Sequence, residues 1–292
     1  MTIYNLGSIN IDHFYRVPHL VQPGETLTAK TYSMGLGGKG ANQSVAAARA
    51  GAVVRHIGGA GPEGWAVARL EALGVDCRFV EQVSAPTGHA IISVDDAGEN
   101  TIILYAGANR EFALSGVTLA LAGAGAGDTL LIQNETAHQV AAARMARERG
   151  MKVIYSAAPF DVVAVQDVLP YASLLALNAV EAEQLSAALG TVLANLPVPE
   201  VLVTRGAQGA EWCDLRSGRS VVHPAFPVEV IDTTGAGDTV AGYFAAALDE
   251  GLTVQAALRL ATAAAALKVT RAGTADAIPT RAEVEAFLKG MG

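Results

Sequence analysis

The sequence contains few of the residues that build disulfide frameworks or structural metal sites. It has two cysteines, Cys77 and Cys213, whose separation fits no metal-binding motif, and its six histidines show no ligand spacing either. We therefore interpret the cysteines as buried or free thiols of a reducing compartment. Because residues 1–7 include no basic region of the kind that begins a signal peptide, we expect a cytoplasmic protein.

Basic clusters and long apolar runs are also absent. The formal net charge is −8, and no group of Lys and Arg residues forms a patch that could hold nucleic acid. The Ala-rich run 256–267 contains Arg259 and is too short to cross a membrane. We therefore expect neither nucleic acid nor a membrane as a partner.

The sequence does contain enough apolar residues for one large folded unit. Hydrophobic residues make up 51% of its 292 residues, which excludes a disordered chain. From residue 53 onward, short apolar runs alternate with helical patterns, which predicts a doubly wound α/β fold: a mostly parallel sheet with helices on both faces. No repeat or linker divides the chain, so residues 1–292 are predicted to form a single domain. The predicted strands are 2–7, 53–57, 129–133, 152–156, 173–177, 201–204, 209–213 and 220–223; one predicted helix ends at 50 and others span 63–73, 140–148, 179–188, 240–248, 254–269 and 281–288.

Two segments, about 11–35 and 87–105, depart from this alternation. In the first, two prolines and a glycine exclude a crossover helix, and residues 26–32 alternate like a strand. The second has two apolar stretches around a turn at 95–98. We interpret the two segments as a small β-sheet lid that excludes water from a reactive site; simple surface hairpins are the alternative.

The stretch 231–239 (Ile-Asp-Thr-Thr-Gly-Ala-Gly-Asp-Thr) joins an apolar approach to an apolar helical run. Gly235, Ala236 and Gly237 keep side chains away from the turn, so their backbone N–H groups can converge on an anion at a helix N-terminus. Asp238 places a carboxylate beside this anion site, which is electrostatically unfavourable unless the carboxylate has a task. We interpret Asp238 as a general base that takes a proton from a hydroxyl attacking phosphorus.

A second glycine-rich stretch, 35–44, carries Lys39 and Asn42 at the start of an Ala-rich helix. Its glycines match G-x-G-x-x-G, but no well-buried strand precedes them and no acidic residue closes a second strand, which disfavours a dinucleotide site. A P-loop is excluded because residue 40 is glycine where serine or threonine must hold magnesium. A glycine loop with one ammonium and one amide suits recognition of a small polyhydroxy molecule.

Polar residues follow several predicted strands, at the edge where an open parallel sheet binds ligands. Asn10 and Asp12 are either ligand contacts or turn residues, and Glu135 either accepts sugar hydroxyls or is a solvated loop charge. Glu181 could organise magnesium through waters or only cap a helix. The turn 204–209 could contact nucleotide phosphates or ribose, or be a plain hairpin turn. The residues alone leave each of these pairs open.

Taken in order, these motifs resemble the ribokinase-like carbohydrate kinase family over nearly the whole chain. The five matching segments are Gly7-Ser8-Ile9-Asn10-Ile11-Asp12, Gly37-Gly38-Lys39-Gly40-Ala41-Asn42-Gln43, Ala106-Gly107-Ala108-Asn109, Asn178-x-x-Glu181 and Asp232-Thr-Thr-Gly-Ala-Gly-Asp238. The resemblance implies ATP-dependent phosphorylation of the terminal hydroxyl of a small sugar, D-ribose first, with Asp238 as the base. It also implies a β-lid that often pairs two subunits, and hence a homodimer.

The same resemblance implies a role for each motif residue. The sugar would be held by Asn10, Asp12, Gly38, Lys39, Asn42 and Glu135. ATP would be held by Asn178, Thr204, Gly206, Gly209 and Gly237, with Thr262 near the adenosine and magnesium bound through water to Glu181. A monovalent cation, K⁺, would bind the side chain of Asp232 and the backbone of Thr234, Lys268, Arg271 and Gly273.

Other functions stay open at this point. A kinase of another sugar, such as deoxyribose or a fructose-type sugar, would use the same chemistry. A nucleoside kinase would need an apolar or aromatic pocket for the base, which the polar set Asn10, Asp12, Lys39 and Asn42 disfavours. A non-catalytic sugar-binding protein would have no use for an intact Asp238, and an NAD-dependent oxidoreductase rests only on the glycine pattern.

Overall fold

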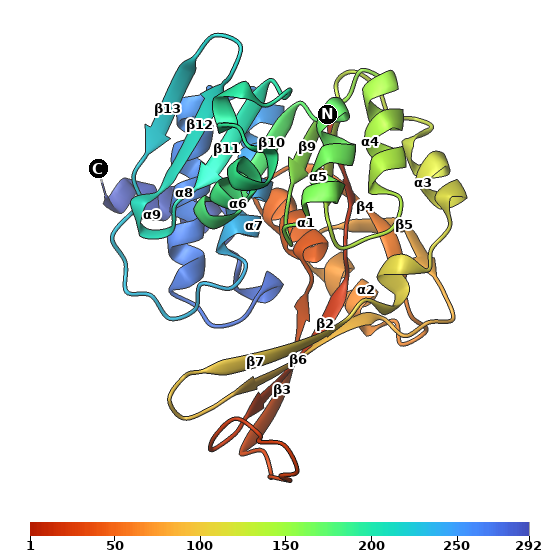
Figure 1. Ribbon diagram of the computed structural model, residues 1–292, viewed down its shortest axis with the longest axis vertical. Helices are drawn as coiled ribbons and strands as arrows, with labels where there is room; N and C mark the ends of the chain where they lie inside the picture. The colour runs from red at the N-terminus through yellow and green to blue at the C-terminus, as the bar shows by residue number, and fades with distance from the viewer. Residues whose placement is uncertain (292) are drawn as a thin grey trace.

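The computed structural model in Figure 1 describes residues 1–291. Its main sheet has nine strands in the order β13-β12-β11-β10-β9-β8-β1-β4-β5. The bounds are β1 Thr2–Leu6, β4 Val53–Ala60, β5 Asp76–Gln82, β8 Thr129–Gln133, β9 Lys152–Ser156, β10 Leu174–Asn178, β11 Glu200–Thr204, β12 Ala210–Asp214 and β13 Arg219–His223. The strands from β11 to β5 are parallel, and the hairpin β12–β13 adds an antiparallel edge.

Helices cover both faces of this sheet (Figure 1). Their bounds are α1 Lys39–Arg49, α2 Trp65–Ala72, α3 Leu114–Leu121, α4 Gln139–Glu148, α5 Val162–Val168, α6 Ala179–Leu189, α7 Ala236–Asp249, α8 Val254–Val269 and α9 Arg281–Gly290, with short 3₁₀ turns at Gly107–Arg110, Leu169–Tyr171, Leu193–Asn195, Gly206–Gln208 and Ala275–Ala277. Residues of α1, α2, α7, α8 and α9 form one apolar core, and residues of α3 to α6 form the other. The predicted doubly wound, mostly parallel α/β fold is confirmed.

Strand β1 shows how side-chain alternation separates the two cores. Ile3 belongs to the core that contains α1 and α7, whereas Tyr4 and Leu6 belong to the core that contains α3 and α4. Because successive strand residues point to opposite faces, Asn5 lies on the side of Ile3, facing α1. There its Nδ2 donates to Gly40 O and to Ser44 Oγ, each over 2.8 Å. The buried strand β1 thus presents one polar side chain, Asn5, to helix α1.

A second sheet, with strand order β3-β2-β6-β7, projects from the main body (Figure 1). Its strands are β2 Asn10–Arg16, β3 Thr31–Gly37, β6 Gly88–Val94 and β7 Asn100–Tyr105. Strand β2 pairs antiparallel with β3 and parallel with β6, which pairs antiparallel with β7. The predicted small second sheet is confirmed, and it is built from the two segments that interrupt the α/β alternation.

Inside the first of these segments the strand prediction was wrong. Residues 26–29 form no strand, and the register places Asn10 opposite Gly37 and Arg16 opposite Thr31. Residues 26–30 lie outside the segment that pairs with β2, and backbone pairing decides where a strand forms. The same register puts part of the predicted glycine loop into β3, so that only Gly38, with φ of 91°, remains as the N-cap of α1.

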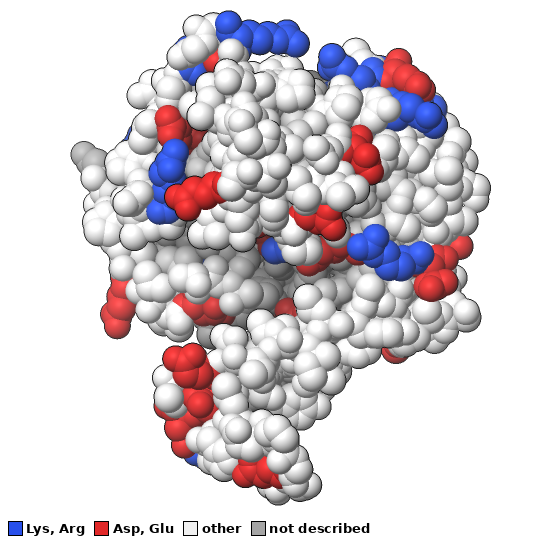
Figure 2. Space-filling view, in the orientation of Figure 1, with Lys and Arg blue, Asp and Glu red and all other residues white. Residues whose placement is uncertain are grey.

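Several predicted absences can be compared with residues 1–291. Cys77 is buried, Cys213 is half-buried, and both are free thiols. Within that range no three His, Cys, Asp or Glu side chains are grouped so as to hold a metal ion. No helix there has both the length and the apolarity that a membrane crossing needs. On the face shown in Figure 2, Lys and Arg side chains are scattered among acidic and neutral ones.

Candidate active site

Asp238 lies in the first turn of α7, and two side-chain amides of α1 hold its carboxylate. Gly235, with φ of 73°, occupies the N-cap position, where the left-handed conformation favours glycine. Asn42 Nδ2 donates to Asp238 Oδ2 over 3.0 Å, and Gln43 Nε2 donates to Oδ1 over 3.0 Å. Asp238 is 8% exposed, so its carboxylate is oriented and largely shielded from bulk water.

The turn before α7 presents backbone N–H groups beside that carboxylate. Within residues 1–291 the N–H groups of Gly235 and Gly237 have no acceptor, whereas the N–H of Ala236 donates to Thr233 O over 3.1 Å. Free donors and the positive end of the helix dipole make this end of α7 suitable for an anion. Of the three residues predicted for the anion site, Ala236 therefore uses its N–H group in the turn itself.

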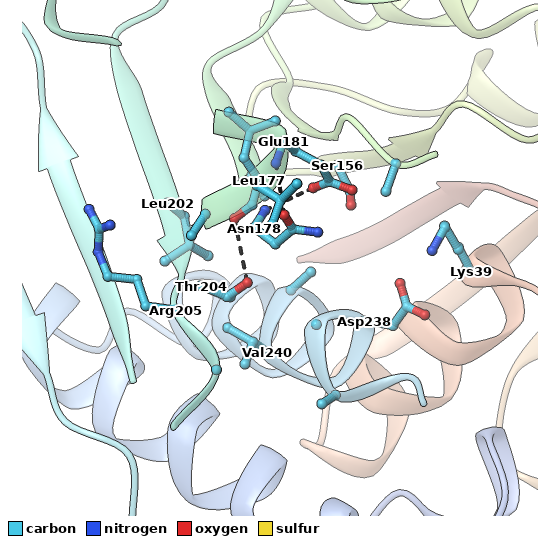
Figure 3. A pocket seen from close by; sticks show the side chains of 18 of the residues that line it. Lys39, Ser156, Leu177, Asn178, Glu181, Leu202, Thr204, Arg205, Asp238 and Val240 are labelled. Carbon is cyan, nitrogen blue, oxygen red and sulfur yellow. Dashed lines mark hydrogen bonds between the residues drawn. The ribbon is translucent and has the colours of Figure 1, made fainter. Parts of the chain in front are cut away.

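Lys39, the first residue of α1, lies beside Asp238 (Figure 3). The negative charge of Asp238 raises the pKa of Lys39, and the charges of Glu135 and Glu181 add to this increase against the opposing effect of burial. The ammonium of Lys39 therefore stays protonated although the residue is half-buried. A fixed positive charge next to the anion site can stabilise a bound phosphate or charge that develops on it.

Glu135 follows strand β8 and is tied to the start of α1. Its Oε2 accepts hydrogen bonds from Ser8 Oγ and, over 3.0 Å, from the backbone N–H of Lys39. Among the described residues no group donates to Oε1, so one carboxylate oxygen is available to a ligand hydroxyl. Glu135 is therefore a half-buried, hydrogen-bonded side chain and not a solvated loop charge, and its contact with a ligand stays a prediction.

Asp12 and Asn10 lie on the first half of β2, where that strand leaves the main body. Burial, and next the charge of Glu135, raise the pKa of Asp12 from its ordinary value of 3.8 to about 7, against the opposing effect of the nearby Thr274 hydroxyl. Asn10 Oδ1 accepts from Asn109 Nδ2 over 2.8 Å. A side chain at residue 37 would overlap the Asp12 carboxylate, so glycine there gives Asp12 its place. Both residues are buried and oriented.

A cavity of about 580 Å³ opens at the ends of β10 and β11 and reaches Asp238 (Figure 3). In Figure 2 the surface is hollowed between the main body and the projecting sheet. The predicted site residues among the lining are Lys39, Asn178, Glu181, Thr204, Gly206, Gly235, Ala236, Gly237 and Asp238. The predicted base, the predicted anion site and the predicted nucleotide turn therefore line the same cavity.

A more apolar cavity of about 460 Å³ adjoins the first and shares with it Thr204, Gly206, Ala236 and Gly237. Gly209 and Thr262, both predicted to contact the nucleotide, line it together with Phe226 and several valines and alanines. The Thr262 hydroxyl is used inside the protein, where it donates to Leu258 O over 2.9 Å. Thr262 therefore offers the cavity its methyl group. A flat apolar ring fits such walls, next to an anion at α7.

Glu181 both caps α6 and faces the larger cavity. Asn178 Oδ1 accepts from the N–H of Glu181, and Glu181 Oε2 accepts from the N–H of Asn178, each over 2.8 Å. Burial raises the pKa of Glu181. Its Oε1 accepts no bond within residues 1–291 and can reach a hydrated cation, because carboxylate oxygen is a ligand that magnesium prefers. The residues present fit magnesium held through water, and the capping alternative holds as well.

Behind Asp238 a chain of buried polar side chains crosses the core, and the sequence did not reveal it. Gln43 Oε1 accepts from Gln133 Nε2 over 2.8 Å, and Gln133 Nε2 also donates to Asn5 Oδ1 over 2.9 Å. Asn5 bonds Ser44, whose Oγ lies 2.8 Å from His56 Nδ1. Gln43 is therefore held on the side away from Asp238. The signal in the sequence was limited to single polar residues on three strands, Asn5, His56 and Gln133.

Asp232, predicted to bind a monovalent cation, contacts the ammonium of Lys268, another of the residues predicted for that site. Asp232 Oδ1 accepts from the N–H of Thr234 and Oδ2 from the N–H of Gly273, each over 2.9 Å. Lys268 Nζ donates to Asp232 O over 3.0 Å and lies 3.9 Å from Asp232 Oδ2. The Lys268 carbonyl, one of the predicted ligands, accepts from the N–H of Arg271 over 3.0 Å. Burial lowers the pKa of Lys268, and the charge of Asp232 opposes that decrease.

A K⁺ ion bound at Asp232 would lie next to this ammonium. Two unit charges about 4 Å apart repel by about 4 kcal/mol at an effective dielectric constant of about 20. Three of the predicted ligand atoms, the two carboxylate oxygens of Asp232 and the Lys268 carbonyl oxygen, already accept hydrogen bonds from the N–H groups of Thr234, Gly273 and Arg271. The residues present therefore do not fit a bound monovalent cation at Asp232.

Hydrogen bonds and close approaches join several of the predicted sugar residues to Asp238 and to one another. Asn42 contacts Asp238, Glu135 contacts Lys39, and a side chain on Gly38 would approach the backbone of Asn10. Within residues 1–291 the lining of the two cavities includes Lys39 but none of the other predicted sugar residues Asn10, Asp12, Gly38, Asn42 and Glu135, and none of the predicted cation residues Asp232, Thr234, Lys268, Arg271 and Gly273.

A buried carboxylate held by amides, beside free N–H groups at a helix N-terminus, is the arrangement of an enzyme that transfers a phosphoryl group to a hydroxyl. The sequence profile of the pfkB family of carbohydrate kinases matches residues 2–281. This match covers nearly the whole chain. The chain belongs to the pfkB family of carbohydrate kinases.

Individual relatives agree with this assignment in length and in fold. A ribokinase from Haemophilus influenzae is 37% identical over 304 aligned residues, which cover 99% of this chain and 98% of the relative. The crystal structure of ribokinase from Thermotoga maritima has a TM-score of 0.89 and 35% identity over 99% of both chains. The structure of Arabidopsis thaliana ribokinase complexed with ribose and ATP has a TM-score of 0.85 and 30% identity over 98% of both chains.

Proposed function

We propose that this chain is an ATP-dependent kinase that phosphorylates D-ribose at O5. The observation that carries the proposal is the Asp238 carboxylate, held by Asn42 and Gln43 beside the free N–H groups of Gly235 and Gly237. The similarity to ribokinases, one of them solved with ribose and ATP, supports the choice of both substrates. The polar residues around Asp238 suit a small polar acceptor, and the two adjoining cavities suit a nucleotide.

In the proposed reaction Asp238 accepts the proton of the sugar's 5-hydroxyl. The sugar oxygen forms a bond to the γ-phosphorus of ATP while the bond from that phosphorus to the β-γ bridging oxygen breaks, so the products are ribose 5-phosphate and ADP. The N–H groups of Gly235 and Gly237 and the Lys39 ammonium bind the oxygens of the transferring group. Because these donors are fixed before the reaction, they need no reorganisation as charge develops.

The sugar is proposed to lie between β2, the start of α1 and the end of β8. Its contacts would be Asn10, Asp12, Gly38, Lys39, Asn42 and Glu135. Carboxylate and amide groups outnumber apolar ones in this set, which favours a polyhydroxy compound over a nucleobase. Gly38 has no side chain, so the backbone there can approach the sugar closely.

The nucleotide is proposed to occupy the two adjoining cavities. Its phosphates would extend from Gly237 toward Asn178 and Thr204, and its base would lie in the apolar cavity near Gly206, Gly209 and Thr262. Glu181 would hold magnesium through water. When bound with ATP, the ion neutralises part of the phosphate charge. No monovalent cation takes part in this proposal, since the Lys268 ammonium lies against Asp232.

The projecting sheet is proposed to act as a lid, within a single domain of residues 1–292. Strand β2 carries Asn10 and Asp12 in its first half and continues into the projecting sheet. A sugar held by these two residues would therefore lie at the base of the sheet. Movement of the sheet toward the main body would exclude water from the phosphoryl group, which favours transfer to the sugar over hydrolysis.

The lid is also proposed to join two copies of the chain. Across the register, Tyr32, Met34, Ile91, Ile103 and Tyr105 share one face of the sheet, and each is at least 39% exposed. Strand β7 is an edge strand whose residues are all exposed. Apolar side chains on an unpaired edge are usually covered by a partner.

Light scattering tests the proposed homodimer. Ile103→Asp should convert a dimer to a monomer, because it places a charge on the apolar face at the edge strand β7. Val222→Asp is the matched control, since Val222 is an equally exposed residue of the edge strand β13. A wild-type protein that is monomeric at micromolar concentration, or an Ile103→Asp dimer, would contradict the proposal.

A coupled assay of ADP release tests the proposed activity. The substrates to compare are D-ribose, 2-deoxyribose, fructose and several nucleosides, and kcat/KM should be highest for D-ribose. A higher value for a nucleoside or another sugar would correct the substrate while keeping the chemistry. Sugar binding by calorimetry without ADP release from any substrate would instead support a non-catalytic sugar-binding protein.

A further inference from the structure

Lys268 is a lysine with no exposed surface, near the C-terminal end of a helix rich in alanine. Its exposure is 0%, and the residues around it on α8 are mostly alanine and leucine. Lysine is almost never fully buried unless its ammonium is paired. Burial of this charge therefore indicates a specific partner.

The partner is Asp232, on the loop that leads into the anion site. Lys268 Nζ donates to the carbonyl oxygen of Asp232 over 3.0 Å and lies 3.9 Å from its carboxylate oxygen Oδ2. The carboxylate itself accepts from the N–H groups of Thr234 and Gly273. The Lys268 ammonium and two backbone N–H groups thus donate to the three oxygen atoms of Asp232.

We infer that the Lys268 ammonium takes the place of the monovalent cation that the family resemblance implies, and that this chain works without K⁺. An ammonium group and K⁺ carry the same charge and are similar in size, and both are bound by carbonyl and carboxylate oxygens. Because the lysine is covalently attached, the charge is present at every salt concentration. The inference rests on the proposed kinase function, for which the cation would be an activator.

The position of Asp232 shows what the tethered charge does. The N–H groups of Ile231 and Asp232 donate to Val269 O over 2.8 and 3.1 Å, so this loop is fastened to the end of α8. Lys268 fastens the same loop through the Asp232 carbonyl. The loop ends at Gly235, whose free N–H group faces the anion site. Lys268 therefore holds the shape of the anion site from behind, without touching the phosphate.

Activity of the wild-type protein in two salts is the first test. Turnover should change less than about twofold when tetramethylammonium chloride is replaced by KCl at the same ionic strength, about 0.1 M. Lys268→Ala removes the ammonium and leaves room for an ion. Its turnover should be low in tetramethylammonium chloride and rise about tenfold or more as KCl saturates the vacated site. Lys268→Met removes the charge but fills the space, so KCl should not restore the turnover of this variant.

A binding measurement separates this inference from the proposed function. The melting temperature of Lys268→Ala should rise with KCl and not with tetramethylammonium chloride, whereas that of the wild type should respond equally to both salts. Lys289→Ala on α9 is the matched control, because it removes an exposed lysine. Absence of kinase activity would leave this measurement valid.

Either of two wild-type results would overturn the inference. One is a several-fold activation by K⁺, and the other is a K⁺-specific increase of the melting temperature. Both use the unmodified protein, so they decide the question even if Lys268→Ala does not fold.

Discussion

Replacing Asp12 with asparagine should stabilise the ligand-free protein at alkaline pH and weaken sugar binding. The fold raises the pKa of this carboxyl from 3.8 to about 7, chiefly through burial and then through the charge of Glu135. The folded state therefore binds the proton more tightly than the unfolded state. Ionisation of Asp12 costs nothing below pH 3.8, costs more as the pH rises toward 7, and reaches its full cost above pH 7.

The size of this cost follows from the two pKa values. At about 1.4 kcal/mol for each pH interval of one between them, the ionised Asp12 destabilises the ligand-free fold by about 4 kcal/mol at pH 8, and by less than about 2 kcal/mol at pH 5. Asp12→Asn removes the charge and keeps the shape. Its free energy of unfolding in urea should exceed that of the wild type by these amounts.

The assay is urea unfolding at pH 5 and pH 8 without sugar. Asp167→Asn is the matched control, since Asp167 is exposed on α5, and it should change stability little at either pH. The same substitution should weaken ribose binding by about 10- to 100-fold although it stabilises the fold, because it removes a charged hydrogen-bond acceptor. The reasoning is refuted if the gain in stability is the same at both pH values, or if Asp12→Asn is less stable than the wild type at pH 8.

Two further substitutions test other parts of the site. Gln43→Met removes the donor to Asp238 Oδ1, so turnover should fall about 10- to 100-fold and the pH profile of kcat should shift, because a charged hydrogen bond is lost. The exposed Gln184→Met should do neither, and a normal profile for Gln43→Met would show that Asn42 alone holds the base. Gly40→Ala places a methyl group into the backbone of Gly7 and Ser8, and should lower the free energy of unfolding by about 2–3 kcal/mol. Gly116→Ala in α3, where the methyl group has room, should instead raise it by about 0.5–1 kcal/mol, and equal effects of the two alanines would contradict the packing argument.

The parts of the site that could be predicted from the sequence are those set by local chain geometry. Three small residues before an apolar helical run place N–H groups and Asp238 in one turn whatever the rest of the fold does. The mostly parallel pairing of the main sheet was likewise predictable, because apolar strands and helices alternate along the chain, whereas the order of its strands was not. Polar residues at strand ends, such as Glu135 and Glu181, could be found from the strand that precedes each.

The parts that could not be predicted depend on contacts between distant segments. Gln43 meets Asp238 across 195 residues and Gln133 across 90, and no local pattern records either contact. Strand β2 was not predicted, and the strand predicted at 26–32 was placed too early relative to β3, because the register of the two strands is set by pairing with each other. Lys268 was assigned by its backbone alone, since the direction of its side chain depends on the rotation of α8 against the loop at Asp232.

Phosphorus NMR of the reaction of D-ribose with ATP tests the role of Asp238 most directly. We expect the wild type to form a single phosphomonoester, at O5. Asp238→Asn should slow its formation about 100- to 10,000-fold, the range typical of a lost general base, while ribose binding by calorimetry stays measurable. Near-normal formation of ribose 5-phosphate by Asp238→Asn, or a wild-type product phosphorylated at another oxygen, would contradict the assignment of Asp238 as the base for the 5-hydroxyl.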